Sequence, residues 1–209
     1  MEPKLNELEK QFYSDGYKFV LKAANAGFTD EALFKSIREM YWMIDEFISS
    51  FSIYTQNQKQ KIACKKDCEW CCHQPVYALS YELDYLNHFI ITRFSKQKQK
   101  EISARAAIKR KKLEGMEKEQ LANSKYPCPL LENGSCIAYQ ARPISCRIYL
   151  SMEVKSCIKF FRDPDNKTNF PALYSFPLRI GRMMNEGFKA ALKTNGIITE
   201  EFRIEEKIF

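Results

Sequence analysis

The sequence has few of the residues on which several common functional sites depend. Only seven of its 209 residues are glycine, and they are scattered, so no glycine-rich phosphate-binding loop is present. His73 and His88 are the only histidines. Two histidines at this spacing exclude an HExxH zinc site and leave few imidazole partners for a serine or cysteine nucleophile.

Long apolar segments are also missing. The first ten residues, MEPKLNELEK, are charged from the start and contain no apolar stretch of the kind that a secretory signal needs. No apolar run approaches the length required to cross a bilayer. We therefore expect a cytoplasmic protein with no membrane partner, in a compartment where thiols stay reduced.

Cysteine is the residue that stands out in what is present. The chain has eight cysteines, and four of them fall within the nine residues CKKDCEWCC. Such clustering is typical of thiolate ligands around a metal ion. A reducing compartment and a chain long enough to build its own core both favour metal ligation over disulfides. The predicted ligands are Cys64, Cys68, Cys71, Cys72, Cys128, Cys136, Cys146 and Cys157.

The spacing of the first four cysteines suits a tight turn. Cys64, Cys68 and Cys71 are close enough in sequence to bring two or three sulfurs to one ion. Cys71 and Cys72 are neighbours, and in an extended backbone their side chains would point in opposite directions. We therefore expect them not to serve one ion as a simple pair. Eight thiolates suit two four-sulfur sites, or one site with spare thiols, and the sequence does not choose between these.

Arginines flank one of the later cysteines. Prolines hold the loops that carry the later cysteines in the segment PCPLLENGSCIAYQARPISCR, residues 127–147. Arg142 and Arg147 both lie within four residues of Cys146. A zinc ion with four thiolates carries a net negative charge, so we expect these guanidinium groups to lie around the sulfurs.

The cysteine pattern resembles that of the small bacterial YkgJ-type cysteine-cluster proteins, described as zinc- or iron-chelating. The compact run ends in the pair Cys71 and Cys72, a PCP-like segment surrounds Cys128, and a further cysteine, Cys157, follows downstream. The closing motif C-x-x-Y-x-x-R-P-x-x-C-R is matched by Cys136, Tyr139, Arg142, Pro143, Cys146 and Arg147. The resemblance covers about residues 64–157 and implies metal chelation without implying a particular reaction. Tyr139 is predicted to lie around the sulfurs with the two arginines.

The identity of the metal stays open between two main alternatives. Zinc suits four thiolates in a closed, structural site, whereas iron or an iron–sulfur cluster uses the same ligands. The spacing CxxxCxxC also resembles the cluster motif of radical SAM enzymes, but sparse glycine and a helical pattern disfavour that fold. Zinc in a mainly structural role, in a protein of unknown biological process, is the favoured function. Iron with a redox or catalytic role is the alternative, so an enzymatic activity is left undecided.

Apolar periodicity predicts a mainly α, single-domain protein with an irregular cysteine-rich metal-binding centre. The domain spans residues 1–209, as an N-terminal helical hairpin (1–62), a cysteine-cluster region (63–160) and a C-terminal helical segment (161–209). Leu5, Leu8, Phe12 and Phe19 share one face of the first helix, and Gly27 is expected to end it. Thr29 is expected to cap the second helix. The inward seam of that helix is Leu33, Ile37, Met40, Ile44, Phe47, Phe51 and Tyr54.

Three further helices are expected. One is capped by Ser80, a charged one spans residues 96–122, and the last starts near Pro171 or Pro177 and ends at Asn195–Gly196. Residues 93–118 carry ten Lys or Arg against three Glu, which equals the formal net charge of +7. This helix could contact an anionic partner, but no aromatics are interleaved for base stacking, and a solvated face is the favoured interpretation. The sequence leaves the oligomeric state unknown.

Overall fold

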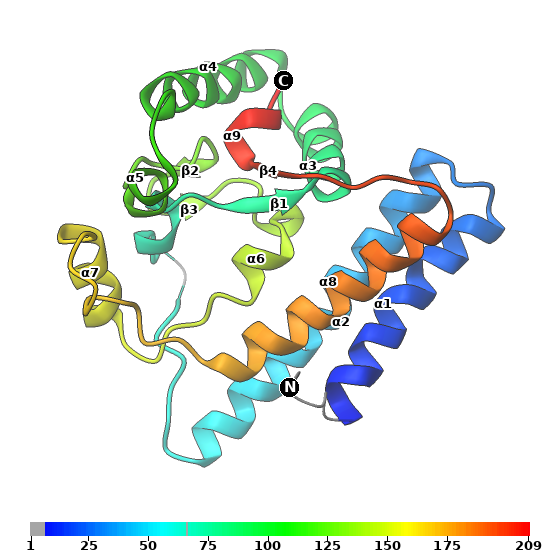
Figure 1. Ribbon diagram of the computed structural model, residues 1–209, viewed down its shortest axis with the longest axis horizontal. Helices are drawn as coiled ribbons and strands as arrows, with labels where there is room; N and C mark the ends of the chain where they lie inside the picture. Colours follow the sequence, from blue (N-terminus) through cyan, green and yellow to red (C-terminus); the bar gives the residue numbers. More distant parts are fainter. Residues whose placement is uncertain (1–6, 66) are drawn as a thin grey trace.

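The computed structural model describes residues 7–65 and 67–209, and it is mainly helical (Figure 1). The helices α1 (Glu7–Asn25), α2 (Asp30–Asn57) and α8 (Ser175–Thr194) form one layer of long helices. None of the helices in the described ranges combines the length and hydrophobicity needed to cross a membrane. The other elements lie to one side of this layer: η1 (Trp70–His73), β1 (Tyr77–Leu79), α3 (Ser80–Arg93), α4 (Lys96–Leu113), α5 (Lys118–Asn123), β2 (Leu131–Glu132), β3 (Ser135–Cys136), η2 (Tyr139–Ala141), α6 (Ile144–Arg147), α7 (Val154–Arg162), β4 (Glu201–Arg203) and α9 (Ile204–Lys207).

The turn between α1 and α2 forms as the sequence predicts. Gly27 adopts a φ of 80°, which ends α1 at low steric cost. The hydroxyl of Thr29 accepts a hydrogen bond from the Ala32 N–H at 3.2 Å and so caps α2. Both helix boundaries that were predicted around this turn are therefore confirmed.

The apolar seam of α2 is buried over most of its length. Ile37, Met40 and Ile44 are fully buried, and Phe51 is nearly so. Tyr54 is instead 60% exposed. Its ring stacks on Phe51 at the surface, with the ring centroids 6.5 Å apart. On α1, Leu8 is also exposed rather than buried, and Leu5 lies outside the described residues.

Two glycines bring the backbones of α1 and α8 into direct contact. A Cβ atom added at Gly16 would lie 2.0 Å from the carbonyl oxygen of Met184. A Cβ atom added at Gly187 would lie 1.9 Å from the carbonyl oxygen of Tyr13. Real Cβ atoms do not approach a backbone atom this closely, so this helix pair depends on both glycines. The last predicted helix is confirmed as α8, with Ile180, Met184 and Phe188 buried.

The strand before α3 and a strand near the C-terminus pair in a small sheet. β1 pairs with β4 in antiparallel register, with Tyr77 opposite Arg203 and Leu79 opposite Glu201. The helix expected here forms as α3 and buries Leu83, Leu86 and Ile90, but its N-cap is Leu79, so the cap predicted at Ser80 is one residue too late. This arrangement places the C-terminus beside α4 (Figure 1).

The prediction of one charged helix over residues 96–122 is wrong. The helix ends at Leu113 and resumes as α5, because Gly115 adopts a φ of 76° between the two. Much of the positive charge of α4 is engaged within the fold. Lys98 and Arg105 pair with Glu132, Lys109 pairs with buried Glu205, and Arg110 donates to the carbonyl oxygens of Glu205 and Ile208.

Candidate metal centre

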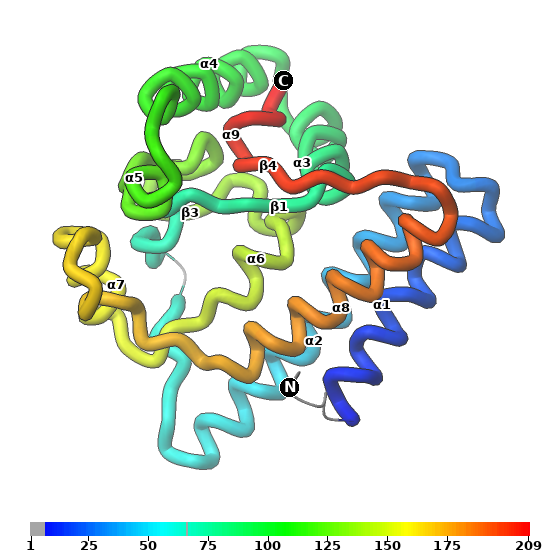
Figure 2. Tube along the Cα trace, in the orientation of Figure 1, coloured from blue at the N-terminus to red at the C-terminus, as the bar shows by residue number. Residues whose placement is uncertain are grey.

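Separate parts of the chain carry the eight cysteines into one region. Figure 2 shows the connection from α2 passing α7 before it reaches β1, and this connection carries the first four cysteines. Phe161 of α7 packs its ring against both Trp70 (5.3 Å between centroids) and His73 (5.0 Å), which fixes α7 against η1. The cysteines lie at Cys64 and Cys68 before η1, Cys71 and Cys72 in η1, Cys128 before β2, Cys136 in β3, Cys146 in α6 and Cys157 in α7.

Four of the thiols form a first group around the start of this region. Burial raises the pKa of Cys64 to about 11, and negative charge on Cys71, Cys68 or Cys157 raises it further. Burial, Cys71 and Cys157 likewise raise the pKa of Cys68. Cys71 and Cys157 act on both Cys64 and Cys68, so these four thiols are electrostatic neighbours.

The remaining thiols form a second group. Burial raises the pKa of Cys128 to about 12, with a further contribution from Cys136. Burial also raises the pKa of Cys146, and negative charge on Cys128, Cys136 or Cys71 adds to this effect. The Cys128 N–H donates to the carbonyl oxygen of Cys72 at 2.7 Å, which joins Cys72 to the same group. Cys71 is therefore the thiol that faces both groups.

The neighbouring cysteines do not point in opposite directions, as an extended backbone would require. They lie in the short 3₁₀ helix η1, and the thiols of Cys71 and Cys72 form a hydrogen bond with each other. This bond is the largest cause of the raised pKa of Cys71. The assumption of an extended backbone is therefore wrong for this pair, because both residues lie in a helical turn. That Cys71 and Cys72 do not serve one ion as a simple pair stays a prediction.

Backbone N–H groups point at several of the sulfurs. Cys68, Cys128 and Cys136 each accept a hydrogen bond from the backbone N–H of the second residue after them, namely Trp70, Leu130 and Ala138. The Ser151 N–H donates to the Cys64 sulfur at 3.2 Å. Such bonds favour the thiolate over the thiol and are typical of the groups that surround a metal–thiolate site.

All eight cysteines are free thiols, and their side chains are not arranged as a closed metal site. Within residues 7–65 and 67–209, no group of three or more His, Cys, Asp or Glu side chains is placed so that it could hold a metal ion. Metal binding would require these cysteines to lose their protons and to rotate toward one another.

The two arginines of the closing motif have different surroundings. The pKa is raised by the Cys72 thiol at Cys71 and by burial at Cys136 and Cys146, and positive charge on Arg142 opposes each rise. The guanidinium of Arg142 stacks on the exposed ring of Tyr139 at 3.8 Å. The Nε atom of Arg142 is buried and has no hydrogen-bond partner in the described part of the chain. A buried, unpaired donor beside three thiols fits a centre in which these sulfurs carry negative charge.

Arg147 is directed mainly toward α2. Its buried guanidinium forms an ion pair with Asp45, donates to the carbonyl oxygens of Arg142 (2.9 Å from Nε) and Gln140, and stacks on the ring of Tyr41 at 4.1 Å. Burial raises the pKa of Cys136, and the positive charge of Arg147 opposes this rise less than that of Arg142 does. Arg147 thus fastens the cysteine loop to the helical layer, and Arg142 is the arginine that faces the sulfurs.

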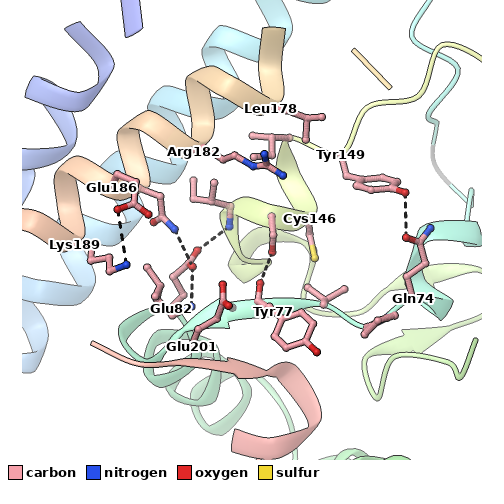
Figure 3. Close-up of a pocket in the computed structure, with 18 of the residues that line it drawn as sticks. Gln74, Tyr77, Glu82, Cys146, Tyr149, Leu178, Arg182, Glu186, Lys189 and Glu201 are labelled. Carbon is pink, nitrogen blue, oxygen red and sulfur yellow. Dashed lines mark hydrogen bonds and ion pairs between the residues drawn. The ribbon is translucent and has the colours of Figure 1, made fainter. Parts of the chain in front are cut away.

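A cavity of about 680 Å³ opens beside the thiols, between β1, α6 and α8. Cys71 and Cys146 both line it. Figure 3 shows Arg182 extending from α8 toward α6, with Tyr149 and Gln74 joined by a hydrogen bond of 3.1 Å at the far end. Two sulfurs are therefore reachable from a space large enough for a small molecule.

Glu82 is the residue of this cavity that the sequence analysis missed. Its buried carboxylate accepts hydrogen bonds from the Ile144 N–H (2.8 Å), the Leu79 N–H (3.2 Å) and the Tyr41 hydroxyl (3.1 Å), and from the Asn185 amide at 3.5 Å. Burial raises its pKa, although each of these bonds opposes the effect. The only signal in the sequence was a glutamate in the first turn of a predicted helix, a position where a carboxylate caps backbone N–H groups.

In comparisons with known proteins, the chain matches no family model, no curated protein and no solved structure. The resemblance to the YkgJ-type proteins is therefore neither supported nor contradicted by them. It stays a prediction that rests on the motif residues, among them Cys136, Arg142 and Cys146.

Proposed function

We propose that this chain is a metal-binding protein whose cysteine thiolates hold zinc in a mainly structural role. One observation carries the proposal: all eight thiols, contributed by separate segments, lie within electrostatic reach of at least one other thiol. Thiolates are strong ligands for zinc, and four of them close its tetrahedral coordination. The eight cysteines supply ligands for two such sites.

The two groups of thiols indicate how the ligands would divide. Cys64, Cys68 and Cys157 would act together with Cys71, and Cys128, Cys136 and Cys146 would act together with Cys72. The backbone N–H groups directed at these sulfurs, and the unpaired Nε of Arg142, would share the negative charge of the thiolates.

A structural role is supported by how little else holds this region. From residue 58 to residue 77, no described residue is fully buried, although this connection carries four cysteines. Connections of this length without regular structure are uncommon in compact domains unless something fixes them. Metal ions that join η1 to β3, α6 and α7 would supply that constraint.

A second candidate function rests on the cavity. Cys71 and Cys146 line it, so a metal in contact with these sulfurs would be accessible to a small molecule. An iron ion or an iron–sulfur cluster there would support redox or catalytic chemistry. An anionic partner on residues 93–118 is a weaker proposal, because Lys98, Arg105 and Lys109 are engaged within the fold. We place the protein in the cytoplasm because its proposed ligands are reduced thiols.

Elemental analysis of anaerobically purified protein, with a visible spectrum, tests the proposal. About two zinc ions per chain and no colour are expected, because eight thiolates fill two four-sulfur sites. Iron with matching acid-labile sulfide and brown absorption would favour the alternative. Protein that binds no metal even after anaerobic reconstitution with zinc or iron would contradict both.

The variant Cys146→Ser identifies the ligands. It should bind less metal and unfold at a lower temperature, since structural metal binding is coupled to folding. Ser145→Ala is the matched control, because it changes the neighbouring residue and removes no thiol. A Cys146→Ser protein that keeps its metal and its melting temperature would remove Cys146 from the ligand set.

A further inference from the structure

A groove between α2 and α3 combines positive charge with aromatic side chains. Its volume is about 420 Å³, within the range of about 300–1,000 Å³ that small-molecule sites occupy. Each helix lines it with one face, since the spacing of the lining residues follows the helical repeat. These residues are Arg38, Tyr41, Trp42 and Asp45 of α2, and Tyr85, His88, Phe89, Thr92 and Arg93 of α3, with Tyr139, Gln140 and Arg147 at the end.

The charges in the groove do not balance. Three guanidinium groups line it, and Asp45 is the only carboxylate of the described residues that does so. That carboxylate is already paired with Arg147. The guanidinium groups of Arg38 and Arg93 form neither a hydrogen bond nor an ion pair with any other described residue, and both residues are exposed. Two positive charges in the groove are therefore left without a partner.

The arginines face a common point. Burial raises the pKa of Tyr85, and positive charge on Arg38, Arg147 and Arg93 opposes this rise. All three guanidinium groups therefore lie within electrostatic reach of one phenol, which sits in the wall of the groove. A single anionic group entering there would be attracted by the positive charge of each of them.

Trp42 adds a flat apolar surface next to these charges. It is 65% exposed and lies four residues after Arg38, so both side chains are on the same face of α2. Its indole ring has no stacking or cation partner in the part of the chain that the structure describes. Guanidinium groups bind phosphate through paired hydrogen bonds, and an exposed indole is a stacking surface for a nucleobase.

We propose that this groove binds a nucleoside phosphate, with the phosphate at Arg38 and Arg93 and the base on Trp42. The ligand is either a free nucleotide or the terminal nucleotide of an RNA strand. The cavity beside the thiols fits such an anion less well, because Glu186 and Glu201 line it together with Arg182. The inference concerns different side chains from the metal proposal and does not depend on it.

Isothermal titration of the purified protein with AMP, inorganic phosphate and a six-nucleotide adenosine RNA tests the inference. AMP should bind at least ten-fold more tightly than phosphate, because the base adds its stacking on Trp42. Arg38→Gln and Arg93→Gln should each weaken AMP binding by about ten-fold, the loss expected when one charge-assisted hydrogen bond is removed. Trp42→Ala should weaken AMP binding by a similar factor and leave phosphate binding unchanged.

Arg182→Gln is the matched control, because it removes another exposed arginine that lines a different cavity. It should leave AMP binding unchanged, and a thermal melt of each variant checks that it is folded. If the RNA binds more tightly than AMP and both arginine variants lose it, the ligand is the end of a strand; if it binds no more tightly, the ligand is a free nucleotide. AMP binding that is no tighter than phosphate binding, or that survives in both arginine variants, would overturn the inference.

Discussion

The helical layer and the cysteine region of this protein are held together by different physical means. In the layer, α1 and α8 touch backbone to backbone at Gly16 and Gly187, and α2 buries most of its apolar seam. In the cysteine region, the connection from residue 58 to residue 77 buries no described residue completely. It is held by hydrogen bonds, some of them to thiol groups, and by the aromatic packing of α7 on η1. The layer is therefore held mainly by apolar burial, whereas the cysteine region depends on a specific set of polar partners.

The largest effect is expected from adding a methyl group where the backbones of α1 and α8 touch. Alanine normally stabilises a helix relative to glycine by about 1 kcal/mol, but at Gly187 the added Cβ would lie 1.9 Å from the carbonyl oxygen of Tyr13. The helices must move apart, so we expect Gly187→Ala to lower the free energy of unfolding by about 3 kcal/mol. Thermal unfolding should then shift down by roughly 6–12 °C.

The control for this prediction is Lys193→Ala in the last turn of the same helix, where the side chain is exposed. It should leave the unfolding temperature within about 2 °C of the original value. The effect of Gly187→Ala should be the same with and without metal, because the clash lies in the helical layer. A Gly187→Ala protein as stable as the original would show that the two helices can separate at little cost.

The sequence predicts which helix faces are buried in the layer better than it predicts which helices touch each other. Apolar spacing at Ile37, Met40 and Ile44 places the inward face of α2, because burial of a helix repeats every three to four residues. Gly16 and Gly187 carry no such signal: a glycine within a helical pattern indicates only a weaker helix. The helix that each glycine contacts depends on tertiary packing, and the residues around the glycine do not reveal that packing.

The sequence predicts that the cysteine region is a metal site, but it does not predict which cysteines lie together. The clustering of thiols indicates a metal site, yet the grouping of Cys157 with Cys64, and of Cys72 with Cys128, depends on how separate loops meet. Arg142 and Arg147 look equivalent in the motif because both are close to Cys146 in sequence. They differ because the short helix α6 turns Arg147 toward Asp45 of α2.

The second prediction tests the link between the two regions. Arg147→Lys keeps the positive charge but loses the planar group that reaches Asp45 and the carbonyl oxygens of Gln140 and Arg142. We expect the free energy of unfolding to fall by about 2 kcal/mol, the contribution of two hydrogen bonds, as measured by urea denaturation. Metal content should be retained, since Arg147 is directed away from most of the sulfurs.

Arg142→Lys is the comparison within the same loop. Arg142 stacks on the exposed Tyr139 and has an unpaired buried Nε, so its replacement should change stability by less than that of Arg147. It should instead weaken metal retention against a competing chelator. Equal losses of stability in the two variants, with equal metal retention, would contradict the division of roles between them.

The smallest expected effect concerns Glu82, which joins the two regions through Tyr41 on one side and Ile144 on the other. Burial raises its pKa in the folded state, so the folded protein keeps this proton to a higher pH than the unfolded chain does. Between the two pKa values the unfolded state binds fewer protons, and the free energy of unfolding must fall as pH rises. Below the unfolded value of about 4.3 and above the raised value, Glu82 contributes no slope.

Glu82→Gln removes this titration while keeping a carbonyl oxygen to accept from Ile144 and Leu79. Urea denaturation from pH 4 to pH 8 should therefore show the original protein losing stability relative to the variant as pH rises, by on the order of 1 kcal/mol. Absolute stability is a poorer readout, because the glutamine N–H₂ group needs acceptors that a carboxylate does not. A stability difference that stays constant across this range would mean that the pKa of Glu82 is the same in the folded and the unfolded protein. The hydrogen bonds from Ile144, Leu79 and Tyr41 would then offset burial completely, and the contact between the two regions would be a charged one at neutral pH.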